Sequence, residues 1–565
     1  MVKKMKAKIA EALFRRHEQY WDEQKAELRK LRAAYMTRYW DKDYAPDQIL
    51  IETTRAYEYI EGYIASLYSR NPSVIVKGDV RGRGDSQKVQ ALSNAFLDKV
   101  RTQIEDVSRL ALIYPCAFLK LYATQHPDPF KRVGVSAVAA WDVVVDTDAP
   151  SWSEQKYVGH RYHITLQDAK AKYGNKKYAA HQLIRFLDYD SGHDNAPYMS
   201  ANLSALNESG HEPDSPFEYI QVVEFYDLEN NKMYVWSPDY ANGEKWLYDG
   251  VEIEIGDGEK TEVQKYDQIP FTDAANNPLA PLVPLYFSRQ PDLPMRGYSA
   301  LRRVYSQVEE TNIIRTYQST MVRRAARQWI VKKGVFTDED MAKLALGADG
   351  EYIEAELSPS QNLSGSIQAV PHTGVPPELE TYIRQVNDDF QRGSVMAPFT
   401  RGEATRATAT EITALASYSS SEIGRLARER DAMIEYAASV YISMMKIFLQ
   451  DEPDVIVING KTQIVRSEDL DGDFSFYALD AGATPVSEAV KKQDFLQAIG
   501  ILMELGVPQQ KVLQELVRKL DLPEDFLETN VEGIQDLAQT QQQPSPTATI
   551  EQGVPGSPEQ VAQLL

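Results

Sequence analysis

The chain has 565 residues, more than one hydrophobic core usually organises, so two to four modules are expected. Its net charge of −21 excludes a protein whose whole surface grips nucleic acid, although local basic patches remain possible. A single cysteine, Cys116, excludes a disulfide framework and a cysteine-ligated zinc site. No apolar run reaches the ~18 residues of a membrane helix, and the charged N-terminus lacks the apolar centre of a signal peptide. We therefore expect a soluble intracellular protein.

Helices are predicted to open the chain. Residues 3–40 have a helical pattern with eleven Lys/Arg against five acids, and a second helix is expected from about Pro46 to Ser69. A short strand at 73–78 follows. Asp85 or Ser86 can then cap a helix that continues to about Leu112.

The pattern becomes strand-rich from Ala117 to about Pro291. One short helix interrupts it, capped by Thr165 and ended by Gly174. Residues 270–294 hold six prolines and are expected to form an extended connector.

A long helix is predicted from Ser299, because no Pro or Gly follows before Gly334. Its apolar face changes direction along its length. The first face carries Leu301, Val304, Tyr305 and Val308, and a nearly opposite face carries Ile314, Tyr317, Met321 and Ala325. Such a helix suits a ring of identical helices with neighbours on both sides. The alternative is a long core helix with a solvated basic face, since residues 296–333 hold nine Lys/Arg against two acids.

A compact α/β insert is expected at 329–373, where Thr337 and Asp340 cap a short helix. A second helix follows it, so two helices bracket the insert. After a Gly/Pro-containing loop at 392–404, about 45 residues of helix are broken only by Gly424. A strand pair, helices from Val486 to about Leu537 and a low-complexity acidic end complete the chain.

The sequence contains no recognisable motif of a catalytic, nucleotide-binding or metal site. The chain has no phosphate-binding P-loop and no Gly-x-Gly-x-x-Gly after a strand. His160 and His163 are three residues apart in a strand pattern, which places them on opposite faces rather than in a metal pair. The acids Asp469, Asp471 and Asp473 lack the Glu that a calcium loop requires. We expect no catalytic residue, cofactor or metal.

Four segments, in their order along the chain, resemble the portal proteins of tailed bacteriophages. They are YIEGYIASLYSRNPSVIVKG, AAWDVVVDTDAPSWSEQKYVGHRYHITLQDAKAKYG, PLVPLYFSRQPDLPMRGYSALRRVYSQVEETN and FTRGEATRATATEI. The resemblance covers about residues 50–535. The presence of Cys116 where many members have Gly and the basic first forty residues depart from the family.

The resemblance implies an α+β chain with long stem and wing helices, a strand-rich wing, a small α/β clip insert and a helical crown. The implied parts are wing 1–295, first stem helix 296–328, clip 329–374, second stem helix 375–391, channel loop 392–404, long helix and wing return 405–485, crown 486–535 and disordered acidic tail 536–565.

The function implied by the resemblance is a non-enzymatic ring at one capsid vertex of a virion, assembled in the host cytoplasm. Its partners would be copies of itself, as a dodecamer, double-stranded DNA in the channel, the terminase motor, tail adaptors and the major capsid protein. An acidic ring repels DNA within about 10 Å, so sparse basic residues can centre the duplex without trapping it.

Three groups of residues are the expected contact sites. The channel loop would meet DNA through Arg392, Met396, Phe399, Arg401 and Arg406. Basic stem residues that can face the channel are Arg315, Arg323, Arg324 and Arg327. The clip would dock the motor and adaptor through Lys332, Lys333, Asp338, Glu339 and Asp340. The alternatives are a loop that is a buried helix–helix connection and an insert that only closes the ring.

Two other functions fit parts of the pattern. A Mg²⁺-dependent nucleic-acid enzyme would use paired acids such as Asp142 and Asp146. The second alternative is another virion structural protein, such as a tail adaptor or an ejection protein. Particle size distinguishes a portal from an enzyme, since a portal forms a ring of more than ten chains and an enzyme is a monomer or a small oligomer.

Overall fold

The structure is a computed structural model that describes a large part of the first 479 residues, all within one compact unit. The described residues are 5–39, 50–69, 71–78, 84–124, 126, 128–183, 186–187, 217–256, 261–266, 268–273, 276–325, 329–333, 336–346, 367–369, 377–394, 409–450, 454–458 and 461–479. The expected crown and acidic tail lie outside these residues.

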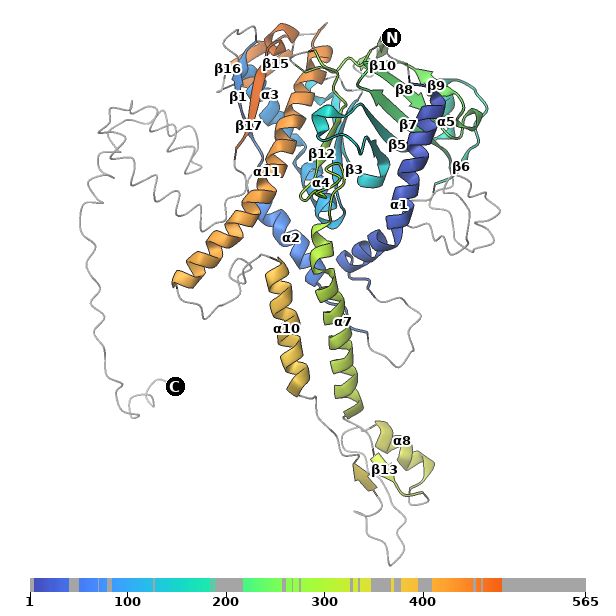
Figure 1. Ribbon diagram of the computed structural model, residues 1–565, viewed down its shortest axis with the longest axis vertical. Helices are drawn as coiled ribbons and strands as arrows, with labels where there is room; N and C mark the ends of the chain where they lie inside the picture. The colour runs from blue at the N-terminus through green and yellow to red at the C-terminus, as the bar shows by residue number, and fades with distance from the viewer. Residues whose placement is uncertain are drawn as a thin grey trace, which may run out of the picture. The chain divides into compact units, whose positions relative to one another are not determined.

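Helices and antiparallel sheets alternate along the described chain, which confirms the predicted α+β class (Figure 1). The helices are α1 (Ala7–Tyr35), α2 (Arg55–Leu67), α3 (Ser86–Lys99), α4 (Arg101–Ile113), α5 (Leu166–Tyr173), α7 (Ala300–Ala325), α8 (Asp338–Leu346), α10 (Pro377–Ser394) and α11 (Ala409–Phe448).

The largest described sheet has the strand order β4-β5-β7-β8-β9, with β6 paired to β7. Its strands are β4 (Val143–Val145), β5 (Tyr157–Thr165), β6 (His181–Gln182), β7 (Glu218–Asp227), β8 (Lys232–Trp236) and β9 (Trp246–Asp249). Side chains alternate across it, so Val223 and Phe225 pack on one face while Ile220 and Val222 enter the main core on the other.

A second sheet has the order β12-β2-β3, and four strand pairs complete the described set. The strands are β2 (Ala117–Ala123), β3 (Val133–Ala139) and β12 (Leu282–Leu285), with the pairs β1 (Val74–Gly78) and β17 (Phe474–Ala478), β10 (Val251–Gly256) and β11 (Thr261–Tyr266), β13 (Trp329–Val331) and β14 (Ile367–Ala369), and β15 (Asp454–Ile458) and β16 (Lys461–Val465).

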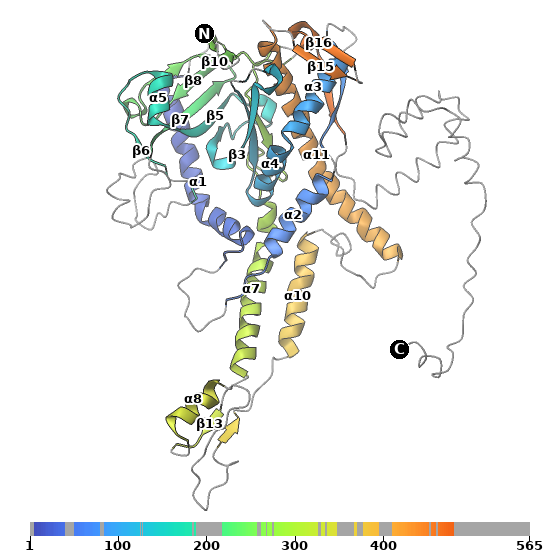
Figure 2. The ribbon, with the colours of Figure 1, turned by 180° about the vertical axis from the view of Figure 1, so that it is seen from behind.

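Helix α1 covers one face of the large sheet (Figure 2). Phe14 is fully buried and its ring lies 5.3 Å from that of Trp236. One turn later, His17 is buried and its Nε2 lies 2.9 Å from the carbonyl oxygen of Trp141. The basic N-terminal segment is thus an amphipathic helix of the fold; Arg15 and Arg16 are exposed on its outer side, whereas Lys25 is buried with its Nζ 4.6 Å from the Phe186 ring centroid.

Two expectations about helix continuity are wrong. The helix expected from Asp85 to Leu112 is two helices, because Val100 leaves helical geometry at φ −100° and ψ 13°. Gly424 does not break α11, which continues through it. The extended proline-rich connector contains strand β12, which pairs with β2.

The buried histidine of α1 gives the fold a pH dependence. Burial lowers the pKa of His17 from 6.5 to about 3, so the unfolded chain binds this proton first as the pH falls. The contribution of neutral His17 to the unfolding free energy is therefore fully present above pH 6.5 and is lost progressively as the pH falls to about 3. We predict that His17→Gln removes about 1.4 kcal/mol per pH unit from the slope of unfolding free energy between pH 6 and 4. Urea titrations at several pH values measure the slope, and an unchanged slope contradicts the assignment.

Candidate functional site: the paired helices and the segments that join them

Helix α7 starts at a tightly fixed junction with α4. A Cβ placed on Gly297 would lie 1.7 Å from the carbonyl oxygen of Pro115, so only glycine permits this approach of the two backbones. Two residues later, the Ser299 hydroxyl donates to the carbonyl oxygen of Ile113 at 2.7 Å and accepts from the amide of Arg302 at 3.1 Å. The expected cap is confirmed, and it also binds the end of α4.

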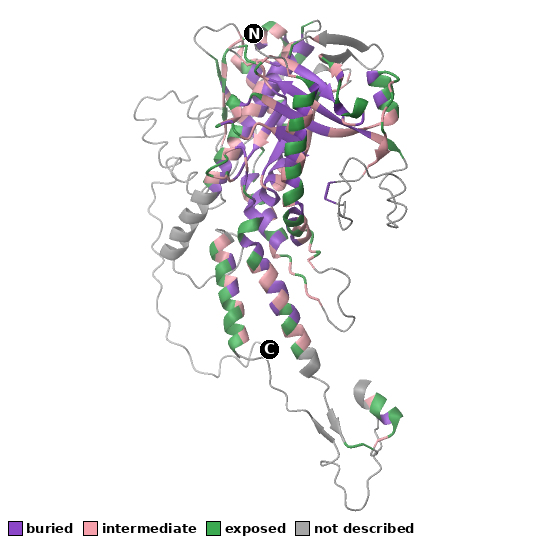
Figure 3. Cartoon of the chain, turned by 45° about the vertical axis from the view of Figure 1, so that its right-hand side comes forward, coloured by how far each residue is buried: buried purple, intermediate pink, exposed green. Residues whose placement is uncertain are grey.

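The first turns of α7 lie in the core. The predicted first apolar face is buried: Leu301 and Val304 are fully enclosed, and Val308 is 1% exposed. Figure 3 shows this buried stretch where α7 leaves the sheets, with more exposed residues along α10.

Helix α10 packs beside α7, and α2 joins both through its first residue. The Tyr382 hydroxyl donates to Glu310 Oε1 at 2.7 Å. Arg55 of α2 donates to Thr311 Oγ1 at 3.0 Å and also bonds Asn387, while its guanidinium lies 5.4 Å from the Phe390 ring centroid. These bonds hold the two helices side by side as a pair (Figure 1).

Within the described part of the chain, the second apolar face of α7 is less covered than the first. Ile314 is only 5% exposed, but Tyr317 is 61% exposed and Met321, one turn further, is 40% exposed. On α10 the Tyr382 ring is 44% exposed although its hydroxyl is bonded. Large apolar side chains that are grouped on one helix pair form a surface suited to a protein partner.

Exposed charge differs between the two helices. The exposed arginines of α7 are Arg302, Arg303 and Arg315. The exposed charged residues of α10 are Glu378, Glu380, Asp388 and Asp389, with Arg384 and Arg392. The outer side of α10 is therefore net acidic, whereas on α7 Arg302 is already paired with Glu27 of α1 at 2.6 Å and Arg315 is exposed near the middle of the helix.

The expected stem and loop arginines are placed only in part. Arg315 is exposed on α7, as the expectation requires, whereas Arg323 and Arg324 lie in α7 with side chains outside the described set. Arg392 was expected in a loop, but it belongs to α10, which continues to Ser394. The remaining expected contact residues of these two groups lie outside the described residues: Arg327, Met396, Phe399, Arg401 and Arg406.

The insert between α7 and α10 contains the β13–β14 pair and α8. Four of its expected docking residues are exposed, namely Lys332, Lys333, Asp338 and Glu339.

Asp340 differs from the other four because it is only 7% exposed. Its Oδ2 accepts from the Thr337 hydroxyl at 2.5 Å, and its amide donates back to Thr337 Oγ1 at 3.2 Å. Thr337 thus caps α8 and the Asp340 carboxylate holds the Thr337 hydroxyl, so the assignment of Asp340 as an exposed docking charge is wrong.

A buried polar cluster that the sequence did not reveal joins the two larger sheets. Lys120 Nζ of β2 donates to Glu224 Oε2 at 2.6 Å and to His160 Nδ1 at 2.8 Å. The hydroxyls of Tyr162 and Tyr226 also donate to Glu224, at 2.8 and 3.2 Å.

The protonation states follow from this geometry. Burial alone would raise the pKa of the Glu224 carboxyl, but Lys120 lowers it to about 2. Burial, with the Lys120 cation, holds the pKa of His160 well below 6.5, so His160 is neutral and accepts from Lys120. The cluster is a charge-paired joint between β2, β5 and β7.

Neither the candidate magnesium acids nor the histidines form a metal site in the described residues. Arg161 binds Asp142 at 2.9 Å, so a guanidinium already occupies that carboxylate. His160 and His163 lie on opposite faces of β5, as predicted; His160 stacks near Tyr162 and the His163 ring lies near His181. Within the described part of the chain, no group of three or more His, Cys, Asp or Glu could hold a metal ion. None of its described helices combines the length and apolar character that a membrane crossing needs.

Comparisons with known proteins give little direct information. No protein-family model matches the chain, and no curated protein matches it. Among solved structures, a chain described as "Neck of empty GTA particle computed with C6 symmetry" is 12% identical. The alignment covers 81% of this chain and 90% of that chain with a TM-score of 0.38, a value at which the likeness carries no argument.

The buried joint can be tested by removing one partner. We predict that Lys120→Met lowers the unfolding free energy by about 3–5 kcal/mol, because Glu224 is left buried without its cation. Lys131→Met is the matched control: Lys131 lies 3.2 Å from Asp128 but is 55% exposed, so its loss costs under about 1 kcal/mol. Urea denaturation measures the unfolding free energy of both variants. Equal values for Lys120→Met and Lys131→Met would show that the buried pair contributes no more stability than the exposed pair.

Proposed function

We propose that this chain is the subunit of a portal ring, a passive conduit for double-stranded DNA at one capsid vertex that also docks a packaging motor and a tail adaptor. The observation that carries the proposal is the second apolar face of α7, where Tyr317 and Met321 are exposed in the single chain. The segment order that resembles portal proteins gives this surface its interpretation.

A neighbouring copy is a partner that fits both helices. Burying large apolar side chains removes them from water, at ~25 cal/mol per Å² of apolar area. Arg315 on α7 and the acidic outer side of α10 are complementary, so α7 of one copy can face α10 of the next. Such a contact joins two different surfaces of the chain. It forms a closed ring when the rotation from one copy to the next is a whole-number fraction of a full turn.

The charge of the chain suits a conduit. Twelve copies of a chain with net charge −21 would carry 12 × (−21) = −252. This charge disfavours tight binding of DNA, because each phosphate paired with Lys or Arg adds affinity through counterion release. Exposed arginines such as Arg315 can centre the duplex.

In the proposed division of the chain, residues 296–328 and 375–391 are the stem and 329–374 the clip. Residues 1–295 and 405–485 are then wing, 392–404 the channel loop and 486–535 the crown. The insert follows α7 and precedes α10 directly in the chain, which supports a clip borne by a helix pair.

The apolar face gives the most direct test of assembly. Twelve copies of 63.9 kDa give a ring of 12 × 63.9, about 767 kDa. We predict that Tyr317→Asp with Met321→Asp reduces the ring fraction at least tenfold, because the contact would bury two carboxylates. Met36→Asp is the control, since Met36 is 48% exposed and lies outside the helix pair. Light scattering after size exclusion measures the mass. If the wild type, the double variant and the Met36 control form rings equally well, the exposed face of α7 does not belong to the interface between copies.

The insert is expected to dock the packaging motor through its exposed acids. We predict that Asp338→Lys with Glu339→Lys leaves rings intact but lowers DNA packaging at least tenfold, because the sign of the contact surface is reversed. Glu154→Lys, at an exposed acid outside the insert, is the matched control. Asp340 is kept because it is buried and accepts from Thr337, which caps α8. Normal packaging by the double variant would assign the insert to ring closure.

The expected loop 392–404, apart from its first three residues, which α10 includes, is proposed to face DNA. We predict that Arg401→Ala with Arg406→Ala leaves ring assembly unchanged and lowers retention of packaged DNA several-fold, because fewer phosphates are bridged. Arg392→Ala is the comparison, since Arg392 is exposed on α10 rather than in the loop. Nuclease protection of filled particles measures retention. Loss of assembly with normal retention in the remaining particles would make the loop a structural connection.

A further inference from the structure

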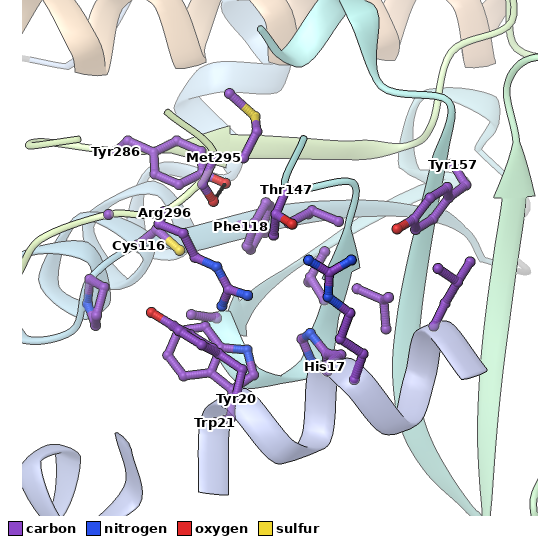
Figure 4. Close-up of a pocket in the computed structure, with 18 residues that line it drawn as sticks. His17, Tyr20, Trp21, Cys116, Phe118, Thr147, Tyr157, Tyr286, Met295 and Arg296 are labelled. Atoms are coloured by element: carbon purple, nitrogen blue, oxygen red, sulfur yellow. Dashed lines mark hydrogen bonds between the residues drawn. The ribbon is translucent and has the colours of Figure 1, made fainter. Parts of the chain in front are cut away.

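A small hollow lies between α1, the start of β2, β4 and the segment that leads into α7 (Figure 4). Its internal volume is about 30 Å³. A water needs roughly 10–15 Å³ of such volume, so the space admits a group of a few atoms. The side chains that decide its chemistry are Arg16, His17, Tyr20, Trp21, Cys116 and Arg296.

The hollow is positively charged within a strongly acidic protein. Its eighteen lining residues include two arginines and neither an aspartate nor a glutamate. Arg16 is exposed, whereas Arg296 is half-buried with its guanidinium against the Tyr20 ring, 3.1 Å from the centroid. Burial lowers the pKa of Arg296, and the groups that act against this shift are Tyr20 (which also hydrogen-bonds Arg296), Cys116 and Tyr286. Arg296 therefore has no carboxylate partner in this wall.

Two buried nitrogen donors of the hollow have no hydrogen-bond partner. They are Nε of Arg296 and Nε1 of Trp21. Trp21 is only 5% exposed, and its ring is held edge-on to those of His17 and Trp141. Leaving a buried donor unpaired costs about 1–3 kcal/mol, so a bound acceptor would recover this energy. In Figure 4 the nitrogen atoms of Arg296, Trp21 and His17 lie together on the α1 side of the hollow.

From this set we infer that the hollow is a binding site for a small carboxylate. A carboxylate brings two acceptor oxygens for the Arg296 guanidinium and the Trp21 indole N–H, and it neutralises the half-buried cation. Arg16 at the exposed edge attracts an anion toward the opening. The volume fits formate or acetate, or the end of an Asp or Glu side chain, and is too small for phosphate with its hydration. The site does not depend on the proposed ring.

The test uses the full-length chain with sodium acetate as the probe. Melting temperatures are compared in 100 mM acetate and 100 mM chloride at pH 7.5 and constant ionic strength, and calorimetric titration gives the dissociation constant. Wild type is expected to melt at least 2 °C higher in acetate. Arg296→Met is expected to weaken binding at least tenfold. Trp21→Phe, which keeps the ring and removes only the N–H, is expected to weaken it at least fivefold. Arg38→Gln, at an exposed arginine just after α1 and outside the hollow, is the control and should bind as wild type does.

The results separate the sources of the carboxylate. Acetate binding by both isolated and assembled chains, lost in the two variants, supports a site for a free ion. Binding by isolated chains only supports a site that a carboxylate side chain of a neighbouring copy fills on assembly. Binding that is equal in wild type, Arg296→Met and Trp21→Phe overturns the site, and so does an absence of acetate binding by the isolated wild-type chain.

Discussion

The close contact between the α4 and α7 backbones is the constraint on which the rest of the arrangement depends. Gly297 brings the chain against Pro115, and Ser299 bonds both the end of α4 and the first turn of α7. Helix α7 therefore leaves the core in a fixed direction. The neighbouring Arg296 is held half-buried in the wall of the small hollow by the same approach of the two segments.

Beyond this junction, the burial of the apolar side chains of α7 decreases along the helix. Its first turns pack into the core, and α2 and α10 pair with its middle through Arg55 and Tyr382. Further along α7, Tyr317 is 61% exposed and Met321 is 40% exposed, since the described residues do not bury them. A single chain gains nothing from apolar side chains in water, whereas a neighbouring copy of the same helix pair would bury them.

Local rules predicted much of the fold. Ser299 and Thr165 were identifiable as caps, and alternating residues predicted β2, β5, β7 and β8. Pairings between distant segments were not predictable: β1 pairs with β17 across about 400 residues, and the proline-rich β12 pairs with β2. Periodicity also could not reveal the break at Val100, because the apolar pattern continues through it.

The candidate site was predicted less completely than the fold. The change of apolar face on α7 pointed to Tyr317 and Met321, which are exposed, although Ile314 of the same face is buried. Asp340 was misjudged because an acid three residues after Thr337 serves equally as a cap and as a surface charge. The Lys120–Glu224 joint was missed, since its members are 104 residues apart and only the packing of two sheets brings them together.

Imaging of the purified wild-type chain tests the central claim most directly. The proposed ring predicts particles with a closed outline and a central hole, in which α7 and α10 of adjacent copies contact each other. Class averages of more than ten copies with that contact would support the claim. Monomers or small open oligomers at micromolar concentration, with Tyr317 and Met321 still exposed to solvent, would contradict it.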